Sequence, residues 1–238
     1  MSFSWEFIIQ TSEYVFRAIP MTLILTVFPA IAGLVIGFLL AVLKQRKIPV
    51  VNQIISIYLS FFRSVPLLVL LFLSYYGAPK LGNFLFHHGN RVLGTKNMDG
   101  NIVAIVVLVL YASAFLCEII RGGISSVDKG QLEAAHALGF NGVQTYTRIV
   151  IPQAFLVVLP NYFNFILGLL KGTSVVFTIS VVDIMAAAKI QAELGYRYIE
   201  SYVLVGMIYI LFSLVFSRLF LYLEDRIKVK MGRKAVPN

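Results

Sequence analysis

One uncharged apolar run near the start of the chain limits what this sequence can fold into. Ala18 to Leu43 is 26 residues without a charged side chain, and about 20 apolar residues suffice to cross the hydrocarbon core of a bilayer. The composition agrees, since 59% of the 238 residues are hydrophobic and only 13% are charged. A soluble domain carries roughly 25% charged residues. The sequence therefore predicts a polytopic membrane protein.

Five apolar runs predict an all-α bundle with five membrane spans. They lie at about 18–43, 56–78, 101–121, 150–170 and 201–223. Arg63 and Pro66 interrupt the second run, so Val50 to Phe62 is expected to form a tilted lead-in to the crossing. Gly172 to Val182 is only 11 uncharged residues, which is too short to cross. We therefore expect residues 172–188 to form a short helix packed within the outer half of the bundle.

The distribution of lysine and arginine predicts the orientation. Eleven of them lie after the first span, between the third and fourth, and after the fifth, whereas six lie on the other side. The excess marks the cytoplasmic face, so segment 1–17 is expected outside and the basic tail 226–238 inside. Because the net charge of +9 resides in loops beside apolar runs, it gives no support to nucleic-acid binding.

The predicted cytoplasmic loop, 122–149, contains clear local signals. Gln131 to Leu138 is a run of strong helix formers, and Gly139 can adopt the left-handed conformation that ends a helix. A second helical stretch is expected to reach Ile151, with Pro152 marking the entry into the fourth span. Two short helices at an angle would suit docking into a groove of another protein. An ordinary amphipathic loop is the alternative on these grounds.

The same loop resembles the signature loop of ABC importer permeases. It reads Glu133-Ala134-Ala135, three residues, Gly139, nine residues, then Ile149-Val150-Ile151-Pro152, with Ile151 in place of the usual leucine. In that family the loop is the coupling helix, which sits in a cleft of the ATPase subunit. The resemblance implies that Glu133, Ala134, Ala135 and Gly139 couple this chain to an ATPase. The chain has no Walker motif, so we expect no catalytic residue, no cofactor of its own, and ATP bound by the partner.

Further segments are similar to polar amino acid permeases, and the likeness covers about 18–225. Phe61 to Leu68 resembles their Phe-Arg-Gly-Thr-Pro-Leu-Leu segment, and Glu118 to Val127 resembles the stretch before their coupling loop. Lys171 to Ser174 resembles the turn after their fourth span, apart from Gly172. The resemblance implies a type I permease fold in the plasma membrane of a bacterium. It also implies an ATPase dimer, a second permease chain, an extracytoplasmic solute-binding protein and an amino acid as partners.

Polar residues within the spans are candidates for substrate binding, because ionisable groups at membrane depth are costly. Arg63 and Glu118 could pair with each other, or Arg63 could meet the carboxylate of a transported amino acid. Asn161 and Asn164 lie three apart and so share a helix face, where they could line a polar strip or form an interhelical hydrogen bond. The candidate substrate residues are Arg63, Ser64, Glu118, Asn161, Asn164 and Phe165. No metal site is expected.

The position after Asn164 bears on the choice of cargo. Many polar amino acid permeases carry an acidic residue there, whereas this chain has Phe165 and offers no counter-charge to a cationic side chain. Thr173 to Tyr202 is similar to permeases for cystine and related sulfur amino acids, which makes cystine or a related sulfur amino acid the leading candidate. A secondary carrier or channel is the competing class, although the complete coupling loop and the absence of inverted repeats argue against it. Gly33 and Gly37 form a Gly-x-x-x-Gly pair that predicts close helix packing.

Overall fold

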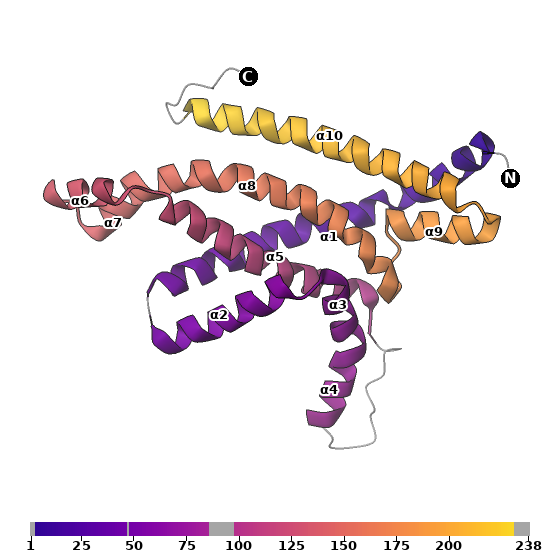
Figure 1. Ribbon diagram of the computed structural model, residues 1–238, viewed down its shortest axis with the longest axis horizontal. Helices are drawn as coiled ribbons and strands as arrows, with labels where there is room; N and C mark the ends of the chain where they lie inside the picture. The colour runs from indigo at the N-terminus through magenta and orange to yellow at the C-terminus, as the bar shows by residue number, and fades with distance from the viewer. Residues whose placement is uncertain (1–2, 47, 86–97, 231–238) are drawn as a thin grey trace.

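The structure, a computed structural model, describes residues 3–46, 48–85 and 98–230. Every regular element within these ranges is helical. Figure 1 shows the long helices α1 (Trp5–Gln45), α5 (Gly100–Ser125), α8 (Ile151–Gly172) and α10 (Tyr198–Lys230) running along one common axis, with α2 (Pro49–Ser64) beside them. Residues 86–97, between the second and third predicted spans, lie outside the described residues. The all-α bundle agrees with the predicted fold class.

Four helical segments are long and apolar enough to cross a membrane. They are Trp5–Gln45, Gly100–Ser125, Gly142–Ile179 and Tyr198–Val229. A fifth candidate is the pair Pro49–Ser64 and Leu67–Phe84, which is bent by 110°. The bend lies at Pro66, which lacks a backbone donor, and at Val65, which is extended (φ −86°, ψ 129°) as residues before proline usually are. Val50 to Phe62, predicted as a lead-in, is thus part of a complete helix.

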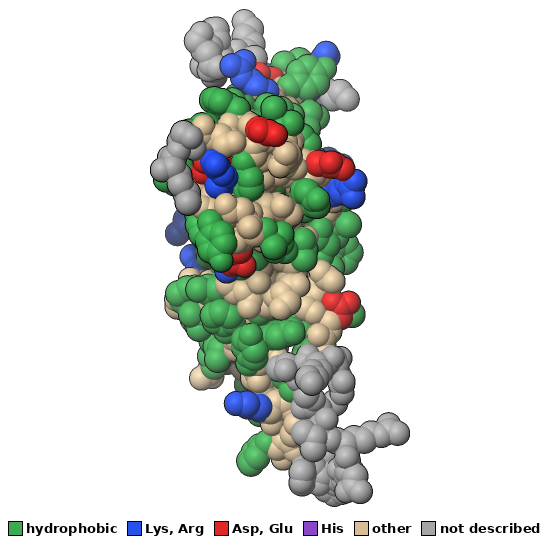
Figure 2. Space-filling model, turned by 90° about the vertical axis from the view of Figure 1, so that its right-hand side faces the viewer, with side chains coloured by type: hydrophobic (Ala, Val, Ile, Leu, Met, Phe, Trp, Pro, Cys, Tyr) green, Lys and Arg blue, Asp and Glu red, His purple; other side chains and the backbone are tan. Residues whose placement is uncertain are grey.

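Helix α1 begins before the first uncharged run. Ser4 is its N-cap, and the Ser4 hydroxyl accepts a hydrogen bond from the Phe7 backbone amide at 3.3 Å. Most of the segment 1–17 that the sequence set apart is therefore continuous with the first span. Viewed end-on from the side where α1 begins, charged side chains of both signs lie among hydrophobic ones (Figure 2).

The packing of α1 on α5 is the most extensive helix contact among the described elements. A Cβ atom added at Gly33 would lie 2.6 Å from the Ala112 Cβ, and one at Gly37 would lie 2.9 Å from the Ser113 carbonyl oxygen. Real Cβ atoms do not approach so closely, so both positions need glycine. The predicted role of the Gly-x-x-x-Gly pair in close packing is confirmed.

The chain between the fourth and fifth spans does not cross. Helix α8 continues into the 3₁₀ helix η4 (Thr173–Ile179), the chain turns at Ser180 with φ 67°, and α9 (Ile184–Gly195) follows. At 12 residues α9 is too short to span the hydrocarbon core, and it packs between α1 and α10. The single short helix predicted over 172–188 is instead two elements, η4 and α9, which are divided by the turn at Ser180. The predicted turn at Lys171–Ser174 is wrong, because helical structure persists to Ile179.

Candidate coupling loop and substrate residues

The loop between α5 and α8 begins with the helix α6 (Lys129–Ala137). The Asp128 side chain caps it by accepting a hydrogen bond from the Gly130 amide at 2.7 Å. The helix ends at Gly139, whose φ of 79° is the left-handed conformation that the sequence predicts there. The Gly139 and Phe140 amides donate to the carbonyl oxygens of His136 and Ala135, each at 3.0 Å, so the last turn is fully closed.

A second short helix, α7 (Gly142–Thr145), follows at once. Asn141 and Gln144 form a reciprocal capping box, with bonds of 2.9 and 3.0 Å. A π-helical turn, η3 (Tyr146–Val150), then joins α7 to α8 without a break. The predicted helical stretch up to Ile151 is confirmed. Pro152 lies in the first turn of α8, where proline is tolerated, in agreement with the predicted entry into the fourth span.

The surface of the loop suits contact with another protein. Glu133, Ala134 and Gly139 are exposed, whereas Ala135 is 1% exposed and fixes α6 against the rest of the loop. Leu138 and Val143 flank Gly139 and are 78% and 73% exposed. Large apolar side chains held this far into solvent are available for contact with another protein. The sequence did not single out either residue, although Leu138 directly precedes the capping glycine and Val143 follows it by four positions.

Side chains tie the loop to the fourth span. Gln153 on α8 donates a hydrogen bond from its side-chain amide to the Gln131 side chain on α6. The Arg148 guanidinium lies over the Phe140 ring, 5.8 Å from its centroid, a distance typical of a cation–π contact. The helical path from α7 into α8 is also unbroken. These contacts and this continuity link α6, α7 and α8 to one another.

Glu118 is the centre of a charge cluster near the end of α5 that leads into the loop. Its carboxylate lies 3.3 Å from Arg121 Nε, 3.5 Å from Lys44 Nζ and 3.9 Å from Arg63 Nη1. The pairing of Arg63 with Glu118, one of the two alternatives from the sequence, is therefore present. The sequence places Lys44 only in the basic segment after the first span. Its approach to Glu118 could not be predicted, because it depends on the packing of α1 against α5. One carboxylate faces three cations here, so positive charge is in excess.

Arg63 also takes part in an aromatic contact that connects three helices. Its guanidinium lies 5.8 Å from the centroid of the Phe115 ring on α5. Phe115 in turn stacks on Phe165 of α8, with centroids 5.9 Å apart and an interplanar angle of 26°. The fold thus brings Arg63, Glu118 and Phe165 into one region. The Arg63 side chain is 45% exposed and remains accessible.

Asn161 and Asn164 lie on an open face of α8. Both are exposed, as is Gly168 one turn further along. The Asn161 amide donates to the Val157 carbonyl of its own helix at 2.8 Å, and neither asparagine makes an interhelical hydrogen bond within the described part of the chain. Ser64 is also exposed at the end of α2. Among the described residues, no cluster of three or more His, Cys, Asp or Glu side chains could hold a metal ion.

The described chain is a multi-span helical bundle with a capped, exposed loop before its fourth span. The family described as "Binding-protein-dependent transport system inner membrane component" matches residues 33–229, and the chain belongs to this family.

Individual relatives show which kind of transport-system membrane component this chain resembles. The chain is 38% identical over 213 residues to the "Probable amino-acid permease protein YxeN" of Bacillus subtilis (strain 168), covering 90% of this chain and 91% of that protein. It is 35% identical over 215 residues to the "L-cystine transport system permease protein TcyL" of the same organism, covering 90% and 87%. A solved structure described as "Crystal structure of an amino acid ABC transporter with histidines" superimposes with a TM-score of 0.83 at 30% identity, covering 95% of this chain and all of that one.

The chain is therefore a permease subunit of an amino acid ABC importer and a multi-pass protein of the bacterial plasma membrane. It is a transport component and not an enzyme, because ATP is hydrolysed by a separate ATPase subunit in such importers. The competing class, a secondary carrier or channel, is set aside by this family membership.

Proposed function

We propose that this chain provides the translocation path for a zwitterionic polar amino acid, with cystine as the leading cargo, and that α6 and α7 dock on a partner ATPase dimer. The observation that carries the proposal is the geometry of the loop. Its left-handed Gly139, its exposed Leu138 and Val143, and its continuity with α8 make a contact surface joined directly to a membrane span.

The coupling follows from what the loop is attached to. A displacement of α6 by a closing ATPase pulls on α8 through the Gln131–Gln153 hydrogen bond and pushes on it through α7 and η3. Helix α8 carries Asn161, Asn164 and Phe165 on its outer half. A shift of this helix therefore moves the candidate substrate residues relative to Arg63 on α2.

The charge balance around Glu118 favours a substrate with a carboxylate. Three cations face one carboxylate in this cluster, and Arg63 is the cation that is both accessible and in contact with the aromatic pair Phe115 and Phe165. A guanidinium can bind a carboxylate in a bidentate manner. Exposed amide groups on α8 would meet the polar groups of the same cargo. The 35% identity to a cystine permease supports cystine among zwitterionic cargoes.

Orientation and partners complete the proposal. The lysine and arginine distribution puts the end that carries α6 and α7 in the cytoplasm and the start of α1 outside. The ATPase dimer then docks at the inner end, the solute-binding protein delivers cargo at the outer end, and a second permease chain completes the path.

A reconstituted complex tests the function directly. The chain is expected to co-purify with an ATPase whose hydrolysis rises when the loaded solute-binding protein is added. Proteoliposomes should accumulate labelled cystine only when ATP is enclosed in the lumen, on the side that the ATPase subunits face. Unlabelled arginine should compete poorly with cystine for this uptake. Cystine uptake that persists with an inactive ATPase, or strong competition by arginine, would contradict the proposal.

Phe165 provides the sharpest test of cargo choice. Burying an unpaired charge against an apolar wall costs several kcal/mol, and about 1.4 kcal/mol corresponds to a tenfold change in affinity. Phe165→Glu should therefore improve uptake of lysine or arginine relative to cystine by about tenfold, measured in proteoliposomes with a solute-binding protein that accepts both. Phe165→Gln is the matched control, since it is polar but neutral. An equal change in both variants would mean that charge at this position does not select the cargo.

A further inference from the structure

A long apolar groove lies between α1, α5 and α8. Its volume is about 570 Å³, and eleven side chains from these three helices line it. Tyr162 is the only one of the eleven with a polar side-chain atom, and its hydroxyl donates to the Ala30 carbonyl oxygen at 3.4 Å. Helix α2 and the elements that follow it, α3 (Leu67–Phe72), η1 (Leu73–Gly77) and α4 (Ala78–Leu85), do not line the groove.

The groove has the length of one lipid leaflet. Its lining on α8 runs from Ile151 to Tyr162, which is about 17 Å along the helix, close to half of the roughly 30 Å hydrocarbon core. Ile124 and Ile151 line one end of it, next to the end of α5 and at the start of α8. Figure 1 shows α6 and α7 at this end of the bundle. The groove therefore lies in the leaflet next to the loop between α5 and α8.

The groove opens away from the candidate substrate residues. Phe115 of α5 stacks on Phe165 and lies beside Arg63. Ile120, which lines the groove, follows Phe115 by five positions and so lies about 140° around the same helix. A polar amino acid would also find no hydrogen-bond partner among the apolar side chains of the lining. The occupant of the groove is therefore not the cargo.

The shape of the lining favours a hydrocarbon chain over a protein helix. Helices in membranes pack closely through small residues, as Gly33 and Gly37 of α1 do against α5. No glycine lines the groove, and Ala154 is the only small residue among large branched and aromatic ones. A flexible acyl chain can fill the uneven spaces between such side chains.

Two arginines lie at the loop end of the groove. Arg148 precedes Ile151 by three residues, about one helical turn. Arg46, the C-cap of α1, follows the lining residue Val35 by eleven positions, which is three turns and therefore the same side of the helix. Both arginines are exposed, and neither has an acidic partner within the described part of the chain. The Arg148 guanidinium lies over the Phe140 ring, which leaves the N–H groups along its edge free to donate.

We propose that a phospholipid with an anionic headgroup binds in this groove, with one acyl chain along α8 and its phosphate on Arg46 and Arg148. Arginine can bind a phosphate in a bidentate manner, and basic pockets between membrane helices on the cytoplasmic side suit anionic headgroups. The proposal rests on the proposed function only for the orientation, which makes this leaflet the cytoplasmic one.

Native mass spectrometry of the purified permease–ATPase complex tests the headgroup. After removal of co-purified lipid, phosphatidylglycerol and phosphatidylcholine with the same acyl chains are added in turn. We expect one phosphatidylglycerol per permease chain, bound severalfold more tightly than phosphatidylcholine. The double variant Arg46→Gln and Arg148→Gln should lose this preference. Arg226→Gln is the matched control, because Arg226 is also exposed and lies 5.1 Å from the centroid of an aromatic ring, that of Tyr222, but is on α10. Equal binding of the two lipids to the unmodified complex, or an equal loss in the control, would overturn the proposal.

A pair of tryptophan variants tests the groove itself. Val35→Trp should lower the binding of both lipids severalfold, because the added ring occupies the space of the acyl chain. Leu211→Trp on α10 should leave binding unchanged, since Val35 and Leu211 are both 58% exposed and only Val35 lines the groove. Inorganic phosphate in excess should not displace the lipid. Displacement by phosphate, or equal binding in the two tryptophan variants, would show that the groove does not hold a lipid. The measurement uses neither cargo nor ATP, so its failure is distinguishable from a failure of the proposed function.

Discussion

In the proposed orientation, the connection between α6 and α7 is the inner corner and the connection between α9 and α10 is the outer corner, and the two are held in opposite ways. The inner corner is built from contacts close in sequence, such as the Asn141–Gln144 capping box. The outer corner is held by contacts between distant segments. The Ser4 amide donates to Glu200 Oε1 at 3.4 Å across 196 positions of the chain, and at the far end of α9 the Ile184 amide donates to Thr22 Oγ1 at 3.1 Å.

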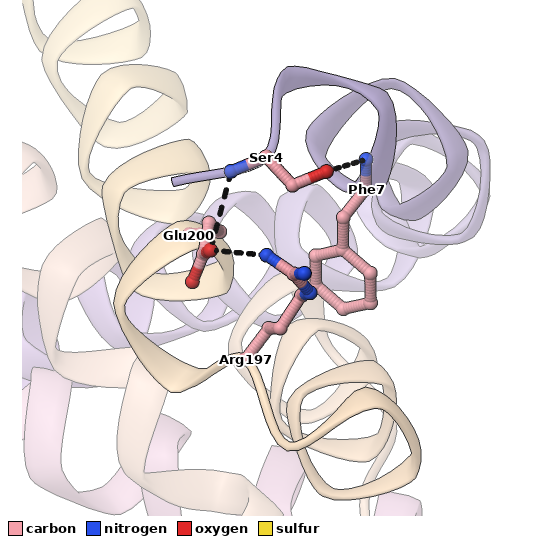
Figure 3. Close-up of polar contacts among 4 residues, drawn as sticks. All are labelled: Ser4, Phe7, Arg197 and Glu200. Carbon is pink, nitrogen blue, oxygen red and sulfur yellow. Dashed lines mark hydrogen bonds and ion pairs between the residues drawn. The ribbon is translucent and has the colours of Figure 1, made fainter. Parts of the chain in front are cut away.

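The outer corner has one centre, drawn in Figure 3. Glu200 accepts hydrogen bonds from the Ser4 amide and from Arg197 Nη1, the latter at 2.9 Å. The Arg197 guanidinium lies 6.0 Å from the centroid of the Phe7 ring. Gly195 packs so tightly on the same ring that a Cβ atom would lie 2.5 Å from Phe7 Cε2. Between them Tyr196 adopts the left-handed conformation, with φ 51°.

The difference shows which parts can move. The inner corner is attached mainly to α8, so it can shift with that helix while keeping its own shape. The outer corner joins α1, α9 and α10, so these three helices are fixed to one another at that end. A motion that starts at the inner corner is therefore expected to pass along α8 while α1 and α10 remain together.

The largest expected effect comes from Gly139→Val at the inner corner. A residue with a side chain costs about 1–2 kcal/mol in the left-handed conformation, and a β-branched one is less suited still. We expect ATP-dependent uptake to be lost while the protein still inserts into the membrane, as measured by transport and by membrane abundance in parallel. Gly122→Val is the control, because Gly122 lies outside α6 and α7, has no positive φ and has an open face, and it should keep most activity. A Gly139→Val variant that fails to accumulate would mean that the loop serves folding.

A smaller effect is expected from Gly195→Leu at the outer corner. The added side chain must displace Phe7, and such overpacking typically costs 1–3 kcal/mol of stability, here about 2 kcal/mol. Trp5 is the single tryptophan and lies two residues from Phe7, so its fluorescence should report the loss at this corner during thermal unfolding in detergent. Uptake should fall less than in Gly139→Val. If the Gly195→Leu and unmodified proteins unfold at the same temperature, the corner does not hold the three helices together.

The smallest effect is expected from a test of which corner faces which compartment. Tyr196 is 75% and Val143 is 73% exposed, so cysteine substitutes at both should react with a maleimide in cells that produce the permease without its ATPase. An impermeant maleimide added outside should label Tyr196→Cys in intact cells, and should label Val143→Cys only after permeabilisation. Labelling in the reverse order would invert the proposed orientation, and external labelling of both would contradict a single crossing between them.

The same comparison explains what the sequence could predict. Gly139 and the helix before it were predictable because helix propensity and the left-handed cap act within a few residues. The pairing of Arg197 with Glu200 was also local, but its role was not, because Ser4 and Phe7 reach that pair only through the course of α1. Pro66 indicated a break in the second span, whereas the 110° angle depends on how Leu70 and Leu71 pack into the core. The sequence predicted Arg63 as a partner of Glu118 but did not predict Lys44, because the approach of Lys44 depends on how α1 packs against α5.

The length of α1 has a consequence for how cargo reaches the importer. At 41 residues the helix is about 62 Å long, twice the roughly 30 Å of the hydrocarbon core. The charged residues Glu6, Glu13 and Arg17 fall in its first 13 residues, a stretch of about 20 Å. In the proposed orientation, with the start of α1 outside, the outer corner would stand on a helical stem above the lipid headgroups. A soluble delivery protein would then meet the permease at that height and would need no affinity for the membrane itself.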